Sequence, residues 1–326
     1  MPLPTSRQVH VNQPLTQISV AYIQRQESFI AQRVFPLVSV NKQSDRYFKY
    51  LRDQWFRSEA AERAPATESA GGGWSIDNTP TYYAPVYAVH KDVDDQTRAN
   101  ADEPINMDRD ATEWVTQQLL LRRERVWVNQ YFTPGVWTTD LQGTDALPGD
   151  FVYWNDYAES DPIGDVTEAG IEIAERTGFR PNVLVLSPWV YNTLKNHPDV
   201  LERIKYTQRG VVTTEILAGL FDVERVVIPW GVENQAVEGA DLDTEFFFGR
   251  HALLVYANPT PSIMQPSGGY IFNWTGYLGA SPQGTRIRRF RMEHLEADRI
   301  EGSMAFAAHL VAPDLGAFFH EAVEAA

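Results

Sequence analysis

The chain of 326 residues contains no cysteine. This absence excludes disulfide bonds, thiolate nucleophiles and cysteine-ligated zinc or iron–sulfur sites, and it leaves the redox compartment open. Lysine is scarce too, because only five of the 28 basic residues are lysine. The others are arginine, whose planar guanidinium suits fixed pairing with carboxylates. The net charge of −15 argues against a general nucleic-acid-binding surface, since a negative field repels phosphates.

Long apolar runs are also missing. No stretch approaches the ~20 apolar residues that a bilayer-spanning helix needs. The N-terminal segment MPLPTSRQVHVNQPL lacks the charged and apolar regions of a signal peptide, so we expect a cytoplasmic protein. With 43% hydrophobic and 12% aromatic residues, the chain has a globular composition and enough length for a substantial core.

Sequence motifs for catalysis and phosphate binding are absent. Ser187 stands between an apolar strand and a helix, but it lies in LSPW and not in the G-x-S-x-G turn of a nucleophilic serine. Because Pro188 favours the first turn of a helix, we interpret Ser187 as a helix cap. The glycines at 71–73 follow no apolar strand and therefore do not form a phosphate loop.

Metal-binding patterns are weak as well. The seven histidines are scattered without the spacing of helical metal ligands. Asp92, Asp94 and Asp95 lack the glycine and glutamate of a calcium loop. We therefore predict no catalytic residue, no cofactor, no metal and no enzyme. An α/β enzyme of unknown class remains a remote alternative, and it would need a pocket with convergent polar groups.

The first hundred residues predict an arm, a helix and a long hairpin. Residues 1–14 are proline-rich and read as extended, and residues 15–33 carry a helical apolar pattern. Strand-like segments at 46–50 and 82–90 flank a long polar, glycine-containing connection, as in a projecting hairpin. Trp55, Phe56 and Trp74 near its tip favour contact with a partner over a merely flexible loop.

A long helix is predicted over residues 106–133, between the cap Asn106 and the stop Thr133-Pro134-Gly135. At ~1.5 Å per residue it is close to 40 Å long. Its predicted apolar stripe comprises Trp114, Leu120, Leu121, Trp127 and Val128. Arginines gather in its second half at positions 122, 123 and 125.

From residue 161 the pattern becomes α/β. A helix is predicted from Asp161-Pro162 to Gly178, then a strand at 183–186, a helix at 188–196 and a short helix to 204. A helix at 215–221 and strands at 226–229, 245–248 and 253–256 follow. Two long strands at 286–293 and 300–311 come last. The first of these carries the one basic patch, which we expect to pair with acidic segments of a neighbouring chain, with weak contact to nucleic acid as the alternative: Arg286, Arg288, Arg289 and Arg291.

This order of elements resembles the major capsid protein of tailed bacteriophages, the Hong-Kong-97-type fold. The segment NVLVLSPWVYNTLKNHPDVLERI is similar to the strand and helix that open the family's axial (A) domain. VTTEILAGLFDVERVVIPW is similar to its next helix and strand, and DTEFFFGRHALLVYANP to the strands that follow. RIRRFRMEHLEADRIEGSMAFAAHLVAP looks like the closing strands of the peripheral (P) domain.

The resemblance implies an α+β fold with five segments. These are an N-arm at 1–41, an extended E-loop hairpin at 42–95, and a P domain at 96–158 with its spine helix at 106–133. An α/β A domain at 159–262 follows, and the P-domain closing strands and the C-terminus occupy 263–326. We expect inter-subunit contacts from the aromatic residues of the E-loop and from two groups of arginines: Trp55, Phe56, Trp74, Arg122, Arg123, Arg286, Arg288, Arg289 and Arg291.

The implied function is structural. Members of the family self-assemble as hexamers and pentamers into an icosahedral shell around double-stranded DNA, which places this chain in the virion capsid after assembly in the host cytoplasm. The implied partners are other copies of the chain, a separate scaffold protein, the portal, in some members a decoration protein, and packaged DNA through weak non-specific contact, with no membrane. An encapsulin-type nanocompartment shell is the alternative.

Two features depart from some members of the family. Residues 51–89 contain no lysine, so a covalent E-loop cross-link to a neighbour's asparagine is not expected unless Lys49 serves. Because we predict that the first helix begins at residue 15, the segment before it is about fourteen residues long. A long N-terminal scaffolding region is therefore not expected, and a separate scaffold protein is.

Overall fold

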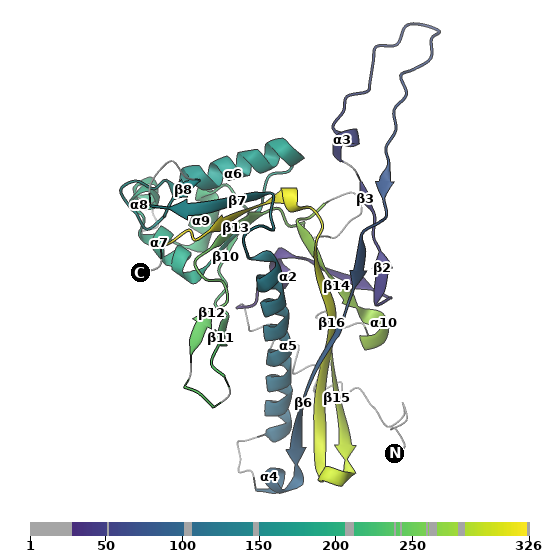
Figure 1. Ribbon diagram of the computed structural model, residues 1–326, viewed down its shortest axis with the longest axis vertical. Coiled ribbons are helices and arrows are strands. Elements are labelled where there is room, and N and C mark those ends of the chain that lie inside the picture. The colour runs from purple at the N-terminus through teal and green to yellow at the C-terminus, as the bar shows by residue number, and fades with distance from the viewer. Residues whose placement is uncertain are drawn as a thin grey trace.

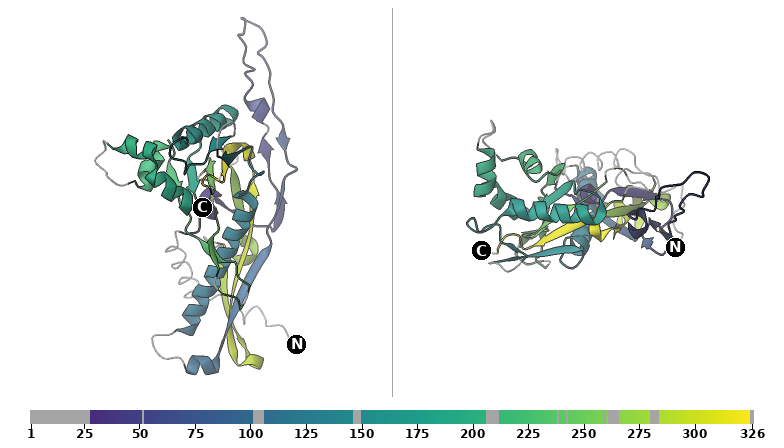
Figure 2. Two further views of the ribbon diagram at one scale, coloured as in Figure 1. Left: turned by 60° about the vertical axis from the view of Figure 1, so that its left-hand side comes forward. Right: turned by 90° about the horizontal axis from the view of Figure 1, so that it is seen from above.

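A computed structural model describes residues 28–324 except 51, 101–105, 146–149, 206–211, 238, 242, 259, 261–265 and 280–283. The predicted N-terminal arm and most of the helix predicted at 15–33 lie outside the described residues. Within them, helix α2 covers Ala31–Val34. The molecule is long and thin, with a narrow hairpin projecting beyond the body at one end (Figures 1 and 2).

The predicted long hairpin is confirmed. Strand β2 (Ser44–Arg46) pairs antiparallel with β5 (Thr81–Tyr83), and β3 (Lys49–Tyr50) pairs with β4 (Ile76–Asp77). Helix α3 (Arg52–Trp55) follows β3, and the connection extends well past the rest of the molecule (Figure 1). We call residues 44–83 the long hairpin. The predicted strand at 82–90 is divided at Pro85, after which β6 (Val86–Asp94) enters the body.

In one part of the molecule the long helix packs on a five-stranded sheet. Helix α5 (Met107–Tyr131) begins at Asn106, whose side chain accepts from Arg109 N at 3.1 Å. It lies along β6 and β16 (Ala297–Leu310) (Figure 1). The sheet order is β1 (Leu37–Val40), β14 (Gly269–Trp274), β16, β15 (Thr285–Met292), with β6 paired to β16 as well.

The buried face of α5 includes three of the five residues of the predicted stripe, Leu120, Trp127 and Val128, but not Trp114. Trp114 is 43% exposed, whereas Val115, Leu119, Arg123 and Trp127 are buried at four-residue spacing. A straight helix turns 3.6 residues per turn, so the residues chosen at seven-residue spacing lie along one edge of the buried face. The helix contacts β16 closely, because a side chain at Gly302 would meet Val115 Cγ1 at 2.3 Å.

The other main part of the molecule contains a six-stranded sheet. Its order is β10 (Arg225–Val227), β9 (Val183–Leu186), β13 (Ala252–Val255), β17 (Gly316–His320), β7 (Thr139–Thr144) and β8 (Phe151–Val152). Three of these strands come from outside the segment predicted as the A domain, so the sheet joins distant parts of the chain. The predicted segment boundaries stay a prediction.

Helices cover one face of this sheet. They are α6 (Pro162–Thr177), α7 (Pro188–Asn196), α8 (Pro198–Ile204) and α9 (Thr214–Leu220). Leu184 and Leu186 of β9 pack under them, and Val183 and Val185 point to the other face, toward the aromatic core beside α5. Alternate residues of a strand point to opposite faces, which explains why this strand is apolar throughout.

The remaining elements are short. Helix α4 (Asp95–Ala99) follows β6, and α10 (Thr275–Leu278) follows β14. The 3₁₀ turns η1 (Glu293–Leu295) and η2 (Pro313–Leu315) end β15 and precede β17. The strand predicted at 245–248 is β12 (Thr244–Phe246), which pairs with β11 (Val232–Asn234) outside the main sheets. Among the described helices, none combines the length and apolarity that a membrane crossing requires.

Candidate interaction surfaces

Three aromatic residues of the long hairpin lie together: Tyr50, Trp55 and Trp74. Trp55 and Trp74 pack with ring centroids 5.6 Å apart, and Tyr50 meets Trp55 edge-on at 6.0 Å. Trp55, Phe56 and Trp74 are 47%, 58% and 63% exposed. Apolar rings this open on a projecting element are typical of a surface that another molecule covers. The structure thus brings Trp55 and Trp74 together as one patch and adds Tyr50, which the sequence analysis did not single out.

Phe56 points toward the helical layer instead. Its Cζ lies 3.6 Å from where a side chain would begin at Gly178, the C-cap of α6. Gly178 has φ +76°, a left-handed conformation that favours glycine. A residue with a side chain would be strained at this position. The long hairpin therefore approaches the end of α6 at Phe56.

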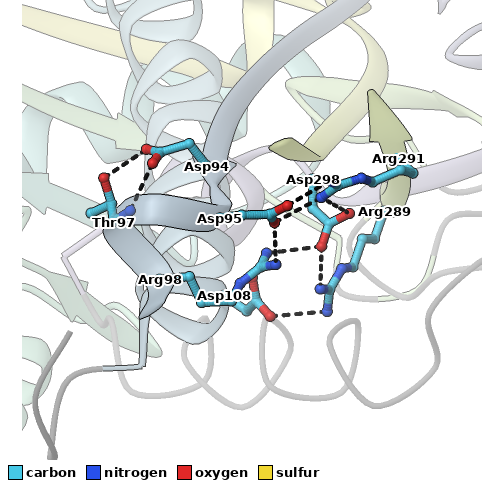
Figure 3. Close-up of polar contacts among 8 residues, drawn as sticks. All are labelled: Asp94, Asp95, Thr97, Arg98, Asp108, Arg289, Arg291 and Asp298. Carbon is cyan, nitrogen blue, oxygen red and sulfur yellow. Dashed lines mark hydrogen bonds and ion pairs between the residues drawn. The ribbon is translucent and has the colours of Figure 1, made fainter. Parts of the chain in front are cut away.

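A network of ion pairs joins four elements at the opposite end of the molecule (Figure 3). Asp298 of β16 accepts from Arg289 at 2.5 Å and from Arg98 of α4 at 2.9 Å. Asp108 in the first turn of α5 pairs with the same two arginines at 2.9 and 3.0 Å. Arg291 binds Asp95 at 2.6 Å. We call these six residues the tip network.

The tip network combines residues positioned by a local helix cap with residues from distant parts of the chain. Asp94 caps α4 by accepting from Thr97 N at 2.7 Å, which fixes Asp95 and Arg98 in the next turn. Partial burial raises the pKa of Asp298, but its hydrogen bonds and charges from Arg289 and Arg98 outweigh this and hold the pKa below its usual value. The ionised carboxylate is thus the form that the network stabilises.

The basic patch of β15 pairs with acids of its own chain. Arg288 binds Glu301 directly across the antiparallel ladder at 2.5 Å, and Arg289 and Arg291 belong to the tip network. Arg286 donates to Tyr277 O at 2.8 Å and stacks over the Tyr277 ring at 4.6 Å. We expected acidic partners on a neighbour; the described contacts are with acids of the same chain, on β16, α4 and α5. Contact with a neighbouring subunit stays a prediction.

The two arginines of α5 that we expected at a subunit contact, Arg122 and Arg123, differ. Arg122 is exposed, with its guanidinium 5.3 Å from the centroid of the Tyr87 ring. Arg123 is only 3% exposed and donates to Gln32 Oε1 at 2.8 Å. The structure does not support Arg123 as an inter-subunit contact, because the wide buried face of α5 includes it. Arg122 stays a prediction.

Glu124, the neighbour of Arg123, caps a helix of another segment. Its carboxylate accepts from Ile30 N at 2.8 Å and from Ala31 N at 3.0 Å, the first amides of α2. Burial raises the pKa of Glu124 to about 7, against the lowering effect of these hydrogen bonds and of Arg123. Burial also lowers the pKa of Arg123 to about 10. Nothing in the local sequence marked this residue as a cap, because its partners are more than ninety positions away.

Ser187 is buried, and its Oγ accepts from Val190 N at 3.5 Å, so the predicted helix cap is confirmed. Across the described part of the chain, no group of three or more histidine, aspartate or glutamate side chains is arranged to hold a metal ion.

Comparison with known proteins finds similarity to phage capsid proteins. No family model matches. The major capsid protein of Burkholderia phage BcepMu is 24% identical over 324 residues, covering 94% of both chains. The major capsid protein of Pseudomonas phage JBD67 is 26% identical over 342 residues, covering 97% of this chain and 98% of the phage protein. The relationship therefore runs along almost the whole chain.

Solved structures agree on the fold. A phage-related protein from Bordetella bronchiseptica superposes with a TM-score of 0.73 at 21% identity, over 98% of this chain and 99% of the other. The capsid protein of cyanophage P-SCSP1u superposes with a TM-score of 0.56 at 10% identity, over 88% and 86%. The chain is thus a homologue of phage major capsid proteins and has the Hong-Kong-97-type fold that the sequence predicted.

Proposed function

We propose that this chain is a major capsid protein, a structural subunit that associates with copies of itself to form the shell of a tailed phage. The observation that carries the proposal is the end-to-end relationship to two phage major capsid proteins. A role in a shell puts the chain in the virion capsid and makes it a structural protein and not an enzyme, since the relationship to capsid proteins covers 94% and 97% of the chain.

The exposed surface of the long hairpin supports self-association. Trp55 and Trp74 are 47% and 63% exposed in the single subunit, and a second copy is the partner that a shell always supplies. Burying aromatic surface contributes roughly 25 cal/mol per Å², so one such contact is modest. A closed shell repeats it many times, and the repeated contacts add up although each is weak.

The finer picture is also part of the proposal. Hexamers and pentamers on an icosahedral lattice would enclose double-stranded DNA, with assembly in the host cytoplasm guided by a separate scaffold protein and starting at a portal. A decoration protein on the outside is compatible with this picture. A chain with net charge −15 would let DNA pack inside without tight binding, since like charges repel.

An encapsulin-type nanocompartment shell is the second candidate, because one subunit fold can enclose either a genome or an enzyme cargo. The two differ in content. Particles from the native host that contain DNA would favour the phage capsid, and particles filled with a protein cargo would favour the nanocompartment.

Expression of the chain alone and with a candidate scaffold protein, followed by negative-stain electron microscopy, tests the proposal. We expect closed shells, capsomers or curved sheets in at least one of the two preparations. A folded monomer that forms none of these at any protein or salt concentration would overturn the proposal.

A further inference from the structure

The segment that follows β17 is fastened to two other parts of the six-stranded sheet. Ala322 N donates to Arg250 O, just before β13, at 2.9 Å. Ala322 O accepts from Trp154 N, just after β8, at 2.8 Å. Ala322 and Val323 are buried in the core that the sheet shares with helices α6–α9. We call residues 321–324 the hook.

Two histidines hold the first residue of the hook. Glu321 N donates to His251 Nδ1 at 2.9 Å. The Glu321 carboxylate accepts from Gln142 Nε2 at 3.1 Å, and Gln142 Oε1 accepts from His320 Nδ1. The two imidazole rings stack with centroids 4.8 Å apart. One imidazole therefore reaches Glu321 directly, and the other reaches it through Gln142.

The backbone of the hook turns sharply at Glu321. This residue has φ +50°, a left-handed conformation that is less stable for a residue with a Cβ than for glycine. At the far end of the hook, Glu324 N donates to Asn155 Oδ1 at 3.0 Å and Glu324 O accepts from Arg250. A short segment that is held in this way opens at a lower cost than the paired strands beneath it.

The bond from Glu321 N requires a neutral imidazole at His251. Nδ1 accepts through its lone pair, and a proton on this nitrogen would turn it into a second donor that faces the amide. The proton would also place a positive charge against the ring of His320. Burial, and then His320, lower the pKa of His251 to about 4, in agreement with this geometry.

A hollow of about 400 Å³ lies beside His251. Besides His251 and Val323, its lining consists of charged and titratable groups from the turn after β8, from β12, from the segment before β13 and from the hook itself: Tyr153, Glu245, Arg250, Glu321 and Glu324. Among them Glu321 raises the pKa of His251, but burial and His320 outweigh it. Water in the hollow can solvate a protonated imidazole once the hook has moved away.

We propose that the hook is an acid-sensitive latch: protonation of His251 releases residues 321–324 while the six-stranded sheet stays folded. The closed latch disfavours the proton, so it is fully stable above pH ~6.5, the ordinary pKa of histidine, and loosens as the pH falls toward 4. From pH 7.5 to pH 5.5 the opening equilibrium should rise about ten-fold. The latch belongs to the single subunit and does not depend on self-association.

Thiol labelling tests the latch, because the natural chain has no cysteine. Ala322→Cys puts a probe in the hook and Ala317→Cys puts a matched probe in β17, since both alanines are fully buried against the same core. Unassembled full-length subunits react with a dithiodipyridine, and each rate is divided by that of a small thiol at the same pH. At pH 5.5 we expect Ala322→Cys to react roughly a hundred-fold faster than Ala317→Cys. We also expect its rate to rise about ten-fold between pH 7.5 and pH 5.5.

His251→Asn identifies the group that switches, because its Oδ1 can accept from Glu321 N and does not titrate. Added to Ala322→Cys, it should reduce the ten-fold rise to less than about two-fold. A rise that persists in this double variant would overturn the role of His251. Equal rates for the two cysteine variants at pH 5.5 would show that the hook opens only when the sheet unfolds. That result, or a rate for Ala322→Cys that ignores pH, would overturn the latch.

Hydrogen exchange of the unsubstituted chain provides a second test that is free of any loosening by the new thiol. After correction for intrinsic exchange rates, the amides of residues 321–324 should lose protection about ten-fold between pH 7.5 and pH 5.5. At both pH values they should exchange faster than the amides of β17. Equal protection of the hook at the two pH values, or exchange of the hook together with β17, would overturn the proposal.

Discussion

His251 shows how one residue of this fold couples stability to pH. It lies at the start of β13 and stacks on His320 of β17 with centroids 4.8 Å apart. Its Nδ1 accepts from Glu321 N at 2.9 Å, which requires an unprotonated nitrogen. Burial, and then the nearby His320, lower its pKa to about 4, while Glu321 acts in the opposite direction. Arg250, Glu245, Glu324 and Tyr153 also line this corner.

We predict that stability falls as the solution becomes acidic between the unfolded pKa, ~6.5, and the folded pKa. The folded state disfavours the proton, so the contribution is fully present above pH 6.5 and is lost as pH falls toward 4. The shift corresponds to about 3 kcal/mol, because one pKa unit is worth about 1.4 kcal/mol. Urea unfolding at a series of pH values measures it.

The matched variant for this prediction is His251→Asn, whose Oδ1 can accept from Glu321 N and does not titrate. The free energy of unfolding of this variant should change less over the same pH range. Replacing the exposed His294 should leave the pH dependence of stability unchanged. An unchanged pH dependence in His251→Asn would contradict the assignment.

Glu124 is the second residue whose replacement should lower the folding stability strongly. In Glu124→Ala the first amides of α2 lose their acceptor and Arg123 loses a buried counter-charge. A cost on the order of 3–5 kcal/mol is expected. Glu124→Gln keeps an oxygen that can accept both amides, so we expect about 1–2 kcal/mol. Chemical denaturation measures both, with the exposed Asn129→Ala on the same helix as control; equal losses in Ala and Gln variants would argue against the capping role.

At the scale of elements, local signals predicted most boundaries. Asn106, Asp161 and Ser187 each cap the helix that the sequence assigned to them, and Gly178 ends α6 in a left-handed conformation. These signals act within a few residues, so they can be read without knowing the fold. The edge of a buried face depends instead on what packs against it, which is why Trp114 was misplaced in the core.

Strand partners were less accessible to sequence reasoning. The pattern at 245–248 indicated a strand, but not that it would pair with β11 outside the main sheets. The segment Gly316–His320 carried no assignment, yet it lies in the middle of the six-stranded sheet between β13 and β7. Pairing between distant segments is decided by the whole fold, and no local motif records it.

The tip network gives a prediction for a group of elements. In Asp298→Asn, Arg98 and Arg289 lose the charge of the carboxylate that joins them, and only Asp108 still bridges the pair. We expect a loss of about 1–2 kcal/mol, smaller in high salt, because the network is partly exposed. Hydrogen exchange should rise first in residues 285–310. Asp45→Asn, in the exposed Lys42–Asp45 pair, is the control. Equal effects of the two changes would show that the network adds nothing.

For the whole molecule, the candidate surfaces were only partly predictable. Aromatic residues in a polar hairpin can be recognised from the sequence alone, and the structure places Trp55 and Trp74 in one patch. The arginines of β15 gave no such indication of their partners, because the acids that bind them come from α4, α5 and β16. Likewise, the groove lined by Pro181 and Phe221 exists only because β9 and β10 pair side by side.

The long hairpin provides the last prediction. Replacing Trp55 and Trp74 by serine removes apolar surface that is already about half exposed, so the free energy of unfolding should change by no more than about 1 kcal/mol. Assembly should suffer far more, because these rings are the ones that a neighbour would cover. Shell yield, measured by sedimentation and microscopy at equal protein concentration, should fall at least ten-fold. Serine at the exposed Glu62 and Glu68 of the same hairpin should leave the yield unchanged. Normal shells from the tryptophan variant would place the assembly contacts elsewhere on the subunit.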